Sequence, residues 1–139
     1  MKVLIADDSL LVCARLITML NEFEQIELVG HVQNAPGAIE LIGRQKPDVI
    51  ILDIQLGKWS GIDVLRKAKH DRPSMIVVML TNHSTPRYRK MCLEAGANYF
   101  FDKSTEFHHL HTLLGELIER HRQTPSLDSA NKNIPLSSN

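Results

Sequence analysis

The chain has few cysteines, few aromatic residues, no surplus of one charge and no long apolar run. Its two cysteines, Cys13 and Cys92, form neither a CxxC pair nor a ligand spacing typical of a metal site, and their apolar helical surroundings predict buried thiols. Lys and Arg number 16 and Asp and Glu also 16, so the chain lacks the basic surplus typical of direct nucleic-acid binding. No segment reaches the ~18 uninterrupted apolar residues of a membrane span, and the N-terminus turns acidic too early for a signal peptide. We therefore expect a cytoplasmic protein that binds neither a membrane nor nucleic acid.

Most of the chain has the composition of a folded domain. With 139 residues, 43% of them hydrophobic and 23% charged, it is long enough to bury the core of one domain. From Gln123 onward, Ser, Asn, Pro and Thr take the place of core-forming residues. The composition predicts a folded domain over 1–121 and a polar, disordered C-terminal tail over 122–139.

Short β-branched runs alternate with longer amphipathic stretches, which predicts five strands and five helices. The run at 49–52 is entirely apolar, which indicates a strand buried on both faces. Right-handed crossovers leave few arrangements, and the most common is a flavodoxin-like, doubly wound α/β fold with a parallel sheet of order 2-1-3-4-5. Strands are expected at 3–6, 26–32, 49–52, 75–80 and 99–101; helices are expected at 11–20, between Asn34 and Pro47, at 61–69, between Thr85 and Gly96, and at 105–120.

Polar residues follow four of the five expected strands. Asp7 and Asp8 come after the first strand, Asp53 after the third, Thr81 after the fourth and Lys103 after the fifth. Because the C-terminal ends of parallel strands share one edge of the sheet, where ligands bind in such folds, we expect these five side chains to converge.

The expected cluster suits a metal ion and a phosphoryl group. Two neighbouring carboxylates ~4 Å apart repel by ~4 kcal/mol at an effective dielectric constant of 20, so the Asp7–Asp8 pair calls for a cation. Three carboxylates form a site for a hard dication, and Mg²⁺ commonly takes one or two of them together with waters and a phosphate oxygen. Thr81 and Lys103 are donors that can hold the other phosphoryl oxygens, which leaves one acidic residue free to accept the group.

These residues resemble the receiver domain of two-component response regulators, over about residues 2 to 121. The resemblance implies that Asp53 accepts a phosphoryl group from a sensor histidine kinase or phosphotransfer protein of a phosphorelay. It implies a Mg²⁺ site made by Asp7, Asp8, Asp53 and the backbone carbonyl of Gln55, with Asp8 a direct ligand. Asp53 would then attack phosphorus in line and form an acyl phosphate.

The resemblance also implies a switch that carries the signal to a downstream protein. Thr81 and Lys103 correspond to the family's threonine and lysine at the ends of the fourth and fifth strands, and Phe100 to its switch aromatic. We expect the phosphoryl group to draw Thr81 inward and Phe100 to rotate into the vacated space. The segment 84–120 is then the face that meets the target, and a homodimer through this face is left open.

Three residues depart from the usual pattern of the family. Ser104 follows Lys103 where a cis proline is common, and a cis bond before another residue costs about 3 kcal/mol, so a trans bond is expected here. Gly57 replaces a common proline four residues after the acceptor, which predicts a looser loop. Phe100 replaces tyrosine and has no hydroxyl group. The departures bear on kinetics and switching more than on phosphorylation itself.

Several other residues have a functional and a plain interpretation. His83, two residues after Thr81, either tunes hydrolysis of the phosphoryl group or is a solvated loop residue. Trp59 either packs on the surface or meets a partner. The residues His108, His109 and His111 are interpreted as a solvated helix face, since no fourth metal ligand is in view.

Three other functions remain as alternatives to a signalling switch that is not an enzyme. A phosphatase with a phosphoaspartate intermediate would need a second carboxylate as general acid-base at the position of Gln55, and glutamine cannot do this. A flavin carrier of the same fold would need an anion-binding first loop, whereas Asp7 and Asp8 repel phosphate. A DNA-binding regulator would need a further domain after residue 121, so the chain would then be a fragment of a longer protein.

Overall fold

A computed structural model of the protein describes residues 1–123. Of the tail predicted over 122–139, residues 122 and 123 belong to the last helix. The remainder, 124–139, lies outside the described residues. The last helix, Phe107–Gln123, thus extends two residues past the predicted boundary at 121.

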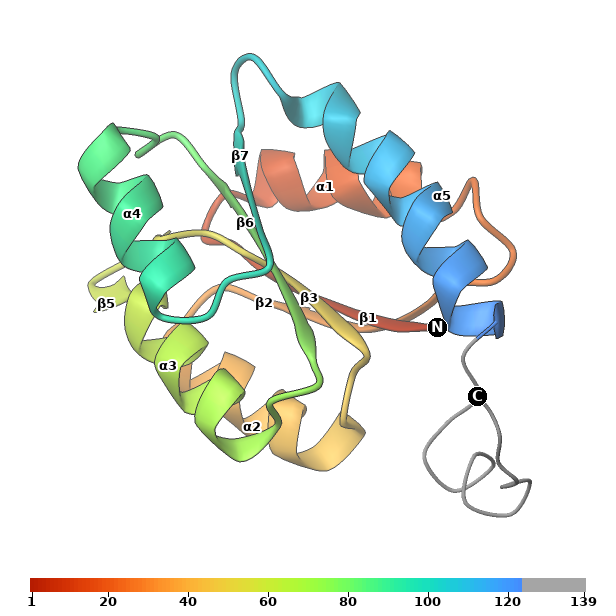
Figure 1. Ribbon diagram of the computed structural model, residues 1–139, viewed down its shortest axis with the longest axis horizontal. Coiled ribbons are helices and arrows are strands. Elements are labelled where there is room, and N and C mark those ends of the chain that lie inside the picture. Colours follow the sequence, from red (N-terminus) through yellow and green to blue (C-terminus); the bar gives the residue numbers. More distant parts are fainter. Residues whose placement is uncertain (124–139) are drawn as a thin grey trace.

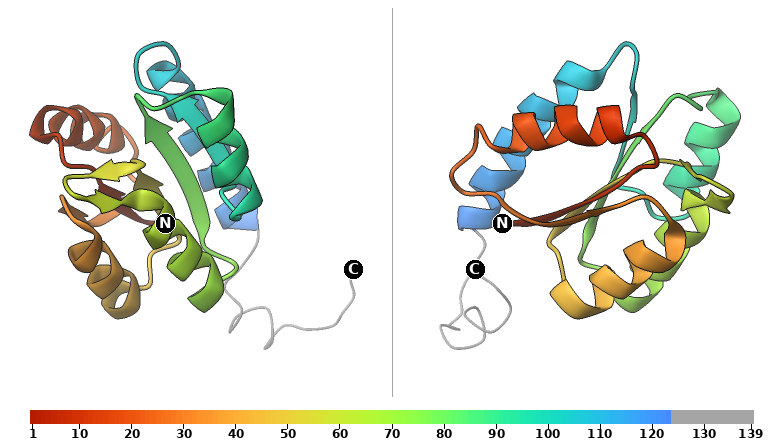
Figure 2. Two further views of the ribbon diagram at one scale, coloured as in Figure 1. Left: turned by 90° about the vertical axis from the view of Figure 1, so that its left-hand side faces the viewer. Right: turned by 180° about the vertical axis from the view of Figure 1, so that it is seen from behind.

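Five parallel strands form one sheet between two layers of helices. Its order is β2-β1-β3-β6-β7, which is the predicted order 2-1-3-4-5 once a small hairpin, β4–β5, is set apart. Figures 1 and 2 show helices α1 and α5 on one side of the sheet and α2, α3 and α4 on the other. The strands are β1 (Lys2–Ala6), β2 (Glu27–Val32), β3 (Val49–Leu52), β6 (Ile76–Thr81) and β7 (Tyr99–Asp102), and the helices are α1 (Leu10–Leu20), α2 (Ala35–Gln45), α3 (Gly61–Asp71), α4 (Pro86–Glu94) and α5 (Phe107–Gln123).

The core consists of two apolar layers, one on each side of the sheet. Alternate residues of a strand point to opposite faces, so Ile50 packs with α2 and α3 whereas Ile51 packs with α1 and α5. All four residues of β3 are buried, as predicted for a central strand. Cys13 and Cys92 are buried free thiols, which confirms the prediction, and burial raises the pKa of Cys92 to about 11.

Local capping explains why the helices begin just beyond the strand ends. The Asn34 side chain accepts a hydrogen bond from the Gly37 amide, and the Thr85 hydroxyl accepts one from Tyr88, immediately before Pro86 opens α4. Both helix starts agree with the prediction. The caps leave short connections at the C-terminal edge of the sheet, so the residues on these connections are held close to one another.

The loop after β3 is a short hairpin, contrary to the loose loop that Gly57 predicted. Strands β4 (Gln55–Leu56) and β5 (Trp59–Ser60) pair in antiparallel fashion around Gly57 and Lys58. Gly57 has φ +63°, the backbone that a tight hairpin turn requires at its first position and that glycine adopts without strain. The amide of Gly57 also donates a hydrogen bond to Asp8 Oδ2 at 3.0 Å, which holds the hairpin against the loop after β1.

In the part of the chain described, no helix has the length and apolarity needed to cross a bilayer.

Candidate functional site

Four polar side chains are buried together at the C-terminal edge of the sheet. Asp7, Asp53, Thr81 and Lys103 are the only buried polar or charged residues among residues 1–123, with 2%, 5%, 0% and 9% of their surface exposed. They follow or end β1, β3, β6 and β7. Burial of charge is costly unless the charges are paired, so the placement confirms that the strand ends gather a polar cluster.

Lys103 pairs with two carboxylates at once. Its Nζ lies 2.7 Å from Asp7 Oδ2 and 2.8 Å from Asp53 Oδ2. Burial acts to lower the pKa of Lys103, but the hydrogen bonds and negative charges of Asp53 and Asp7 outweigh it and raise the pKa above its ordinary value. The ammonium therefore stays charged and sits beside the oxygens of Asp53.

The pKa of Asp7 is raised in this arrangement. Its burial raises its pKa, and the neighbouring Asp53 charge acts in the same direction. Lys103 and the Ser9 amide, which donates to Asp7 Oδ1 at 2.8 Å, offset part of the effect. The raised pKa means that the fold disfavours the charged form of this carboxyl group.

The three carboxylates form a candidate cation site. One oxygen each of Asp7, Asp8 and Asp53 can be chosen so that all lie within 4.8 Å of one another, and Asp8 is exposed at the rim. Three carboxylates against the single ammonium of Lys103 leave negative charge uncompensated. Oxygen donors with an excess of negative charge fit a hard dication such as Mg²⁺.

Thr81 and His83 lie on the adjoining loop after β6. The buried Thr81 hydroxyl accepts a hydrogen bond from the His83 amide at 3.0 Å and can still donate its own proton to another oxygen. His83 Nε2 lies 2.8 Å from Gln55 Oε1, so the histidine bridges this loop to the hairpin after Asp53. The bridge was not foreseen, because nothing in the sequence pairs two residues 28 positions apart.

The sequence matches a known protein family over most of its length. The model of the response regulator receiver domain matches residues 3–115. The chain belongs to this family. Receiver domains act in phosphorylation-dependent signalling by two-component systems and generally bind Mg²⁺.

Curated relatives of this receiver domain carry it within longer proteins. A protein-glutamate methylesterase/protein-glutamine glutaminase of Vibrio vulnificus is 36% identical over 105 residues, which is 74% of this chain and 30% of the relative. The transcriptional regulatory protein YhcZ of Bacillus subtilis, described as uncharacterized, is 31% identical over 106 residues, 76% of this chain and 50% of the relative. The chain thus spans about a third to a half of the length of these relatives.

Solved receiver domains share the fold. The receiver domain of a putative LuxO repressor protein from Vibrio parahaemolyticus superposes with a TM-score of 0.78 at 27% identity, covering 88% of this chain and 92% of its own. The response regulator domain of Thermotoga maritima CheB gives a TM-score of 0.73 at 24% identity, covering 90% and 98%. The second likeness shows the fold alone.

Of the other predicted residues, Gln55 lies beside Asp53 and Phe100 lies in the core. The Gln55 amide points to Asp53 Oδ1, with 3.4 Å between the nitrogen and the oxygen. Phe100 is 4% exposed in the core layer beneath α4, where the Arg89 guanidinium is 5.4 Å from its ring. Its ring is thus already inward in this conformation. The bond before Ser104 is trans, as expected.

Two features near the acceptor were missed from the sequence. The β4–β5 hairpin has a detectable signal, since glycine at the first of two turn residues between strand-forming neighbours is typical of a tight hairpin. Gly61 is the other: its amide donates to the Ile54 carbonyl, and a Cβ built on it would overlap the Asp53 carbonyl oxygen. No sequence signal distinguishes this glycine from an ordinary helix start.

Three of the histidines and Trp59 lie on the surface. His108, His109 and His111 are exposed, and the acidic triad is the only metal-competent group found among the described residues. His111 pairs instead with Glu22 at 3.0 Å. Trp59 is a surface residue with 38% of its area exposed.

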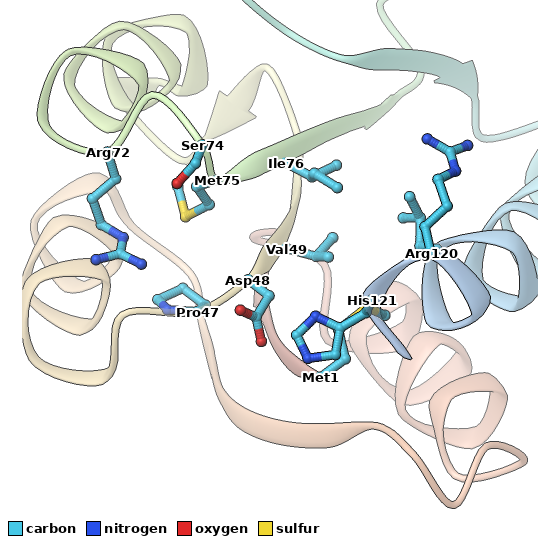
Figure 3. A pocket seen from close by; sticks show the side chains of 11 residues that line it. Met1, Pro47, Asp48, Val49, Arg72, Ser74, Met75, Ile76, Arg120 and His121 are labelled. Atoms are coloured by element: carbon cyan, nitrogen blue, oxygen red, sulfur yellow. The ribbon is translucent and has the colours of Figure 1, made fainter. Parts of the chain in front are cut away.

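A pocket of about 280 Å³ at the opposite edge of the sheet does not contribute to this site. Figure 3 shows its charged lining, with Asp48 in the middle, Arg72 on one side and Arg120 and His121 on the other. The Asp48 carboxylate accepts a hydrogen bond from the Lys2 amide at 2.7 Å. None of the predicted functional residues lines this pocket.

Proposed function

We propose that this receiver domain accepts a phosphoryl group on Asp53 from a sensor histidine kinase or phosphotransfer protein and acts as a signalling switch. The observation that carries the proposal is the pairing of one buried ammonium, Lys103 Nζ, with both Asp53 and Asp7 at 2.8 and 2.7 Å. A structural ion pair needs only one carboxylate. A second and a third carboxylate around it are explained by a metal ion and a transferred group.

The chemistry follows from the positions of the groups. An oxygen of Asp53 attacks phosphorus in line, the bond from phosphorus to the donor breaks, and the leaving group departs with its electron pair. The Lys103 ammonium stabilises the negative charge that gathers as an anion attacks an anion, and the Thr81 hydroxyl donates to a phosphoryl oxygen. Mg²⁺, held by Asp7, Asp8, Asp53 and the Gln55 carbonyl, would supply further charge neutralisation when bound.

The same site favours a switch over a phosphatase. Gln55 occupies the position where a phosphatase of this chemistry carries its general acid-base, and its side-chain oxygen is engaged by His83. Without that group, water attack on the acyl phosphate is slow, so the phosphorylated state lasts long enough to signal. Turnover of a generic phosphate ester would favour the phosphatase instead.

Partners are proposed on two surfaces. The kinase or phosphotransfer protein must reach the rim where Asp8 is exposed. The target binds the 84–120 face, where Tyr88 and Leu93 of α4 expose 36% and 44% of their area; a homodimer through this face stays a prediction. If residues 1–121 are the receiver part of a longer chain, its relatives point to a methylesterase or a transcriptional regulator as the whole protein.

Intact mass spectrometry tests the proposal. The protein is incubated with Mg²⁺ and acetyl phosphate beside the Asp53→Ala variant, with Asp63→Ala as the matched control at an exposed aspartate of α3. We expect the mass of one phosphoryl group on the wild type and the control, and none on Asp53→Ala or without Mg²⁺. A phosphoryl group that remains on Asp53→Ala would show that the acceptor is wrong.

A further inference from the structure

A second polar network lies directly behind Lys103 and is centred on Asp102. The Asp102 Oδ1 atom accepts hydrogen bonds from the backbone amides of Ser104 at 2.7 Å and Thr105 at 3.1 Å. Its Oδ2 atom accepts one from the Ser84 hydroxyl. One carboxylate therefore takes three donors, two from the turn after Lys103 and one from the loop after β6.

The turn is closed by backbone and side-chain contacts at both ends. The Asp102 amide donates to Glu106 Oε1 and the Glu106 amide donates to the Asp102 carbonyl, each at 2.9 Å. The Lys103 amide donates to the Thr81 carbonyl at 3.0 Å. Lys103 is thus the one long side chain that leaves this turn toward the acidic cluster.

The network depends on the residue that departs from the family's usual proline. Ser104 has an amide hydrogen, which proline lacks, and this hydrogen is the one that Asp102 binds at the shorter distance. The hydrogen bond from Ser84, together with those from the Ser104 and Thr105 amides, lowers the pKa of Asp102. The carboxylate is therefore charged, and charge-assisted hydrogen bonds are stronger than neutral ones.

Lys103 needs such support because its side chain is long. A lysine loses considerable rotamer freedom when its ammonium is fixed in one place, and here Nζ must meet Asp7 and Asp53 simultaneously. Among the described residues, no hydrogen bond joins Asp102 to either of these carboxylates, so we expect an effect on the site to pass through Lys103 or through the loop that carries Ser84.

We infer that Asp102 is a positioning residue for Lys103: its carboxylate fixes the turn that carries the ammonium and ties that turn, through Ser84, to the loop that begins at Thr81. The inference rests on the proposed function, because a fixed ammonium matters most where an anion must approach Asp53. Asp102 does not touch the reacting atoms. It sets where Lys103 begins its reach toward them.

The first measurement is independent of phosphorylation. NMR detects the ¹⁵Nζ–¹H resonance of a lysine ammonium when hydrogen bonds protect it from rapid exchange with water. We expect the Lys103 resonance in the wild type and in Asp102→Asn, whose side-chain oxygen still accepts from the Ser104 and Thr105 amides. We expect it to be lost in Asp102→Ala. A resonance that is equally strong in Asp102→Ala would overturn the inference.

The second measurement is the rate of phosphorylation by acetyl phosphate. Asp102→Ala should be slower by about tenfold, less than the roughly 100-fold that a 1 Å misplacement of a catalytic group can cost, whereas Asp102→Asn should stay within about threefold of the wild type. Ser84→Ala removes only the hydrogen bond between the two loops. Its phosphorylation rate should lie between those of Asp102→Ala and Asp102→Asn. Asp71→Ala is the matched control, since Asp71 is also hydrogen-bonded but lies at the end of α3.

The two measurements together separate the possible failures. A slow Asp102→Ala variant with an intact Lys103 resonance would show that Asp102 acts by another route, and the inference would be wrong. A wild type that takes no phosphoryl group would overturn the proposed function, while the Lys103 resonance would still decide the positioning role. Circular dichroism shows that each variant is folded at the assay temperature.

Discussion

The Asp7 carboxyl group is buried at 2% exposure and has a raised pKa because burial disfavours its charged form. Asp7→Asn removes that charge, keeps an oxygen for the Ser9 amide, and leaves Lys103 paired with Asp53. We expect the free energy of unfolding at pH 7 to rise by about 1 kcal/mol, an ordinary size for one substitution. Urea unfolding at pH 7 measures it.

The pH dependence of that difference has a definite sign. A pKa raised above the ordinary value of 3.8 means that the contribution of Asp7 to stability is fully present below pH 3.8 and is lost as the pH rises through the folded-state pKa. The advantage of Asp7→Asn should therefore shrink as unfolding is repeated at lower pH toward 4. An advantage that stays constant or grows on acidification would contradict the raised pKa.

Gly61 packs directly against the backbone of Asp53 and Ile54. A Cβ built there would overlap the Asp53 carbonyl oxygen, and the backbone cannot move without displacing Asp53. Gly61→Ala should lower the free energy of unfolding by about 3 kcal/mol, as severe overpacking does. Gly115→Ala is the control: it lies within α5 with open space around it and should gain up to ~1 kcal/mol. Equal effects in thermal unfolding would contradict the close approach.

At the scale of loops and hairpins, the His83–Gln55 bridge joins the connection after β6 to the β4–β5 hairpin beside Asp53. Opening it gives water easier access to a phosphoryl group on Asp53. His83→Ala should shorten the lifetime of the phosphorylated protein by roughly fivefold, the worth of one hydrogen bond of about 1 kcal/mol. The decay of the phosphorylated mass after removal of the donor measures this, with the exposed His108→Ala as control. A longer lifetime would mean that His83 assists the attack of water.

Elements with a strong periodic pattern could be predicted from the sequence. The apolar run at 49–52 is β3 to the residue, and the caps Asn34 and Thr85 begin their helices where the side chains indicated. The topology then fixed which residues meet, so the convergence of Asp7, Asp53, Thr81 and Lys103 followed from their place after each strand. Local chemistry and topology were sufficient for this part.

Contacts between loops could not be predicted in the same way. The His83–Gln55 and Ser84–Asp102 hydrogen bonds join residues 28 and 18 positions apart, and no period or motif relates them. The hairpin was missed because Gly57 was interpreted as the sign of a flexible loop. In the structure it supplies the positive φ of a tight turn. Loop pairing depends on where the sheet brings the loops, which is known only once the fold is assembled.

At the scale of the whole molecule, the site and the proposed relay face lie on connected elements. Thr81 ends β6, which pairs with β7, so that Met79 lies opposite Phe100 and Thr81 opposite Asp102. Helix α4 packs over β7. The Arg89 guanidinium of α4 lies over the ring of Phe100 and donates a hydrogen bond to the Phe100 carbonyl oxygen. A displacement of Thr81 therefore has a physical path to the exposed side of α4.

Amide chemical shifts test whether that path is used. When Asp53 of the wild type is phosphorylated, we expect shifts in the acidic loops and across the 84–120 face, because the phosphoryl group draws the Thr81 hydroxyl and biases an equilibrium between two arrangements of the face. Thr81→Ala has no hydroxyl group, so its shifts should stay in the acidic loops although the phosphoryl group is present. Wild-type shifts confined to the loops would show that the face does not respond. Equal shifts across the face in both proteins would show that it responds without Thr81, in which case the strand pairing of β6 and β7 rather than the hydroxyl carries the change.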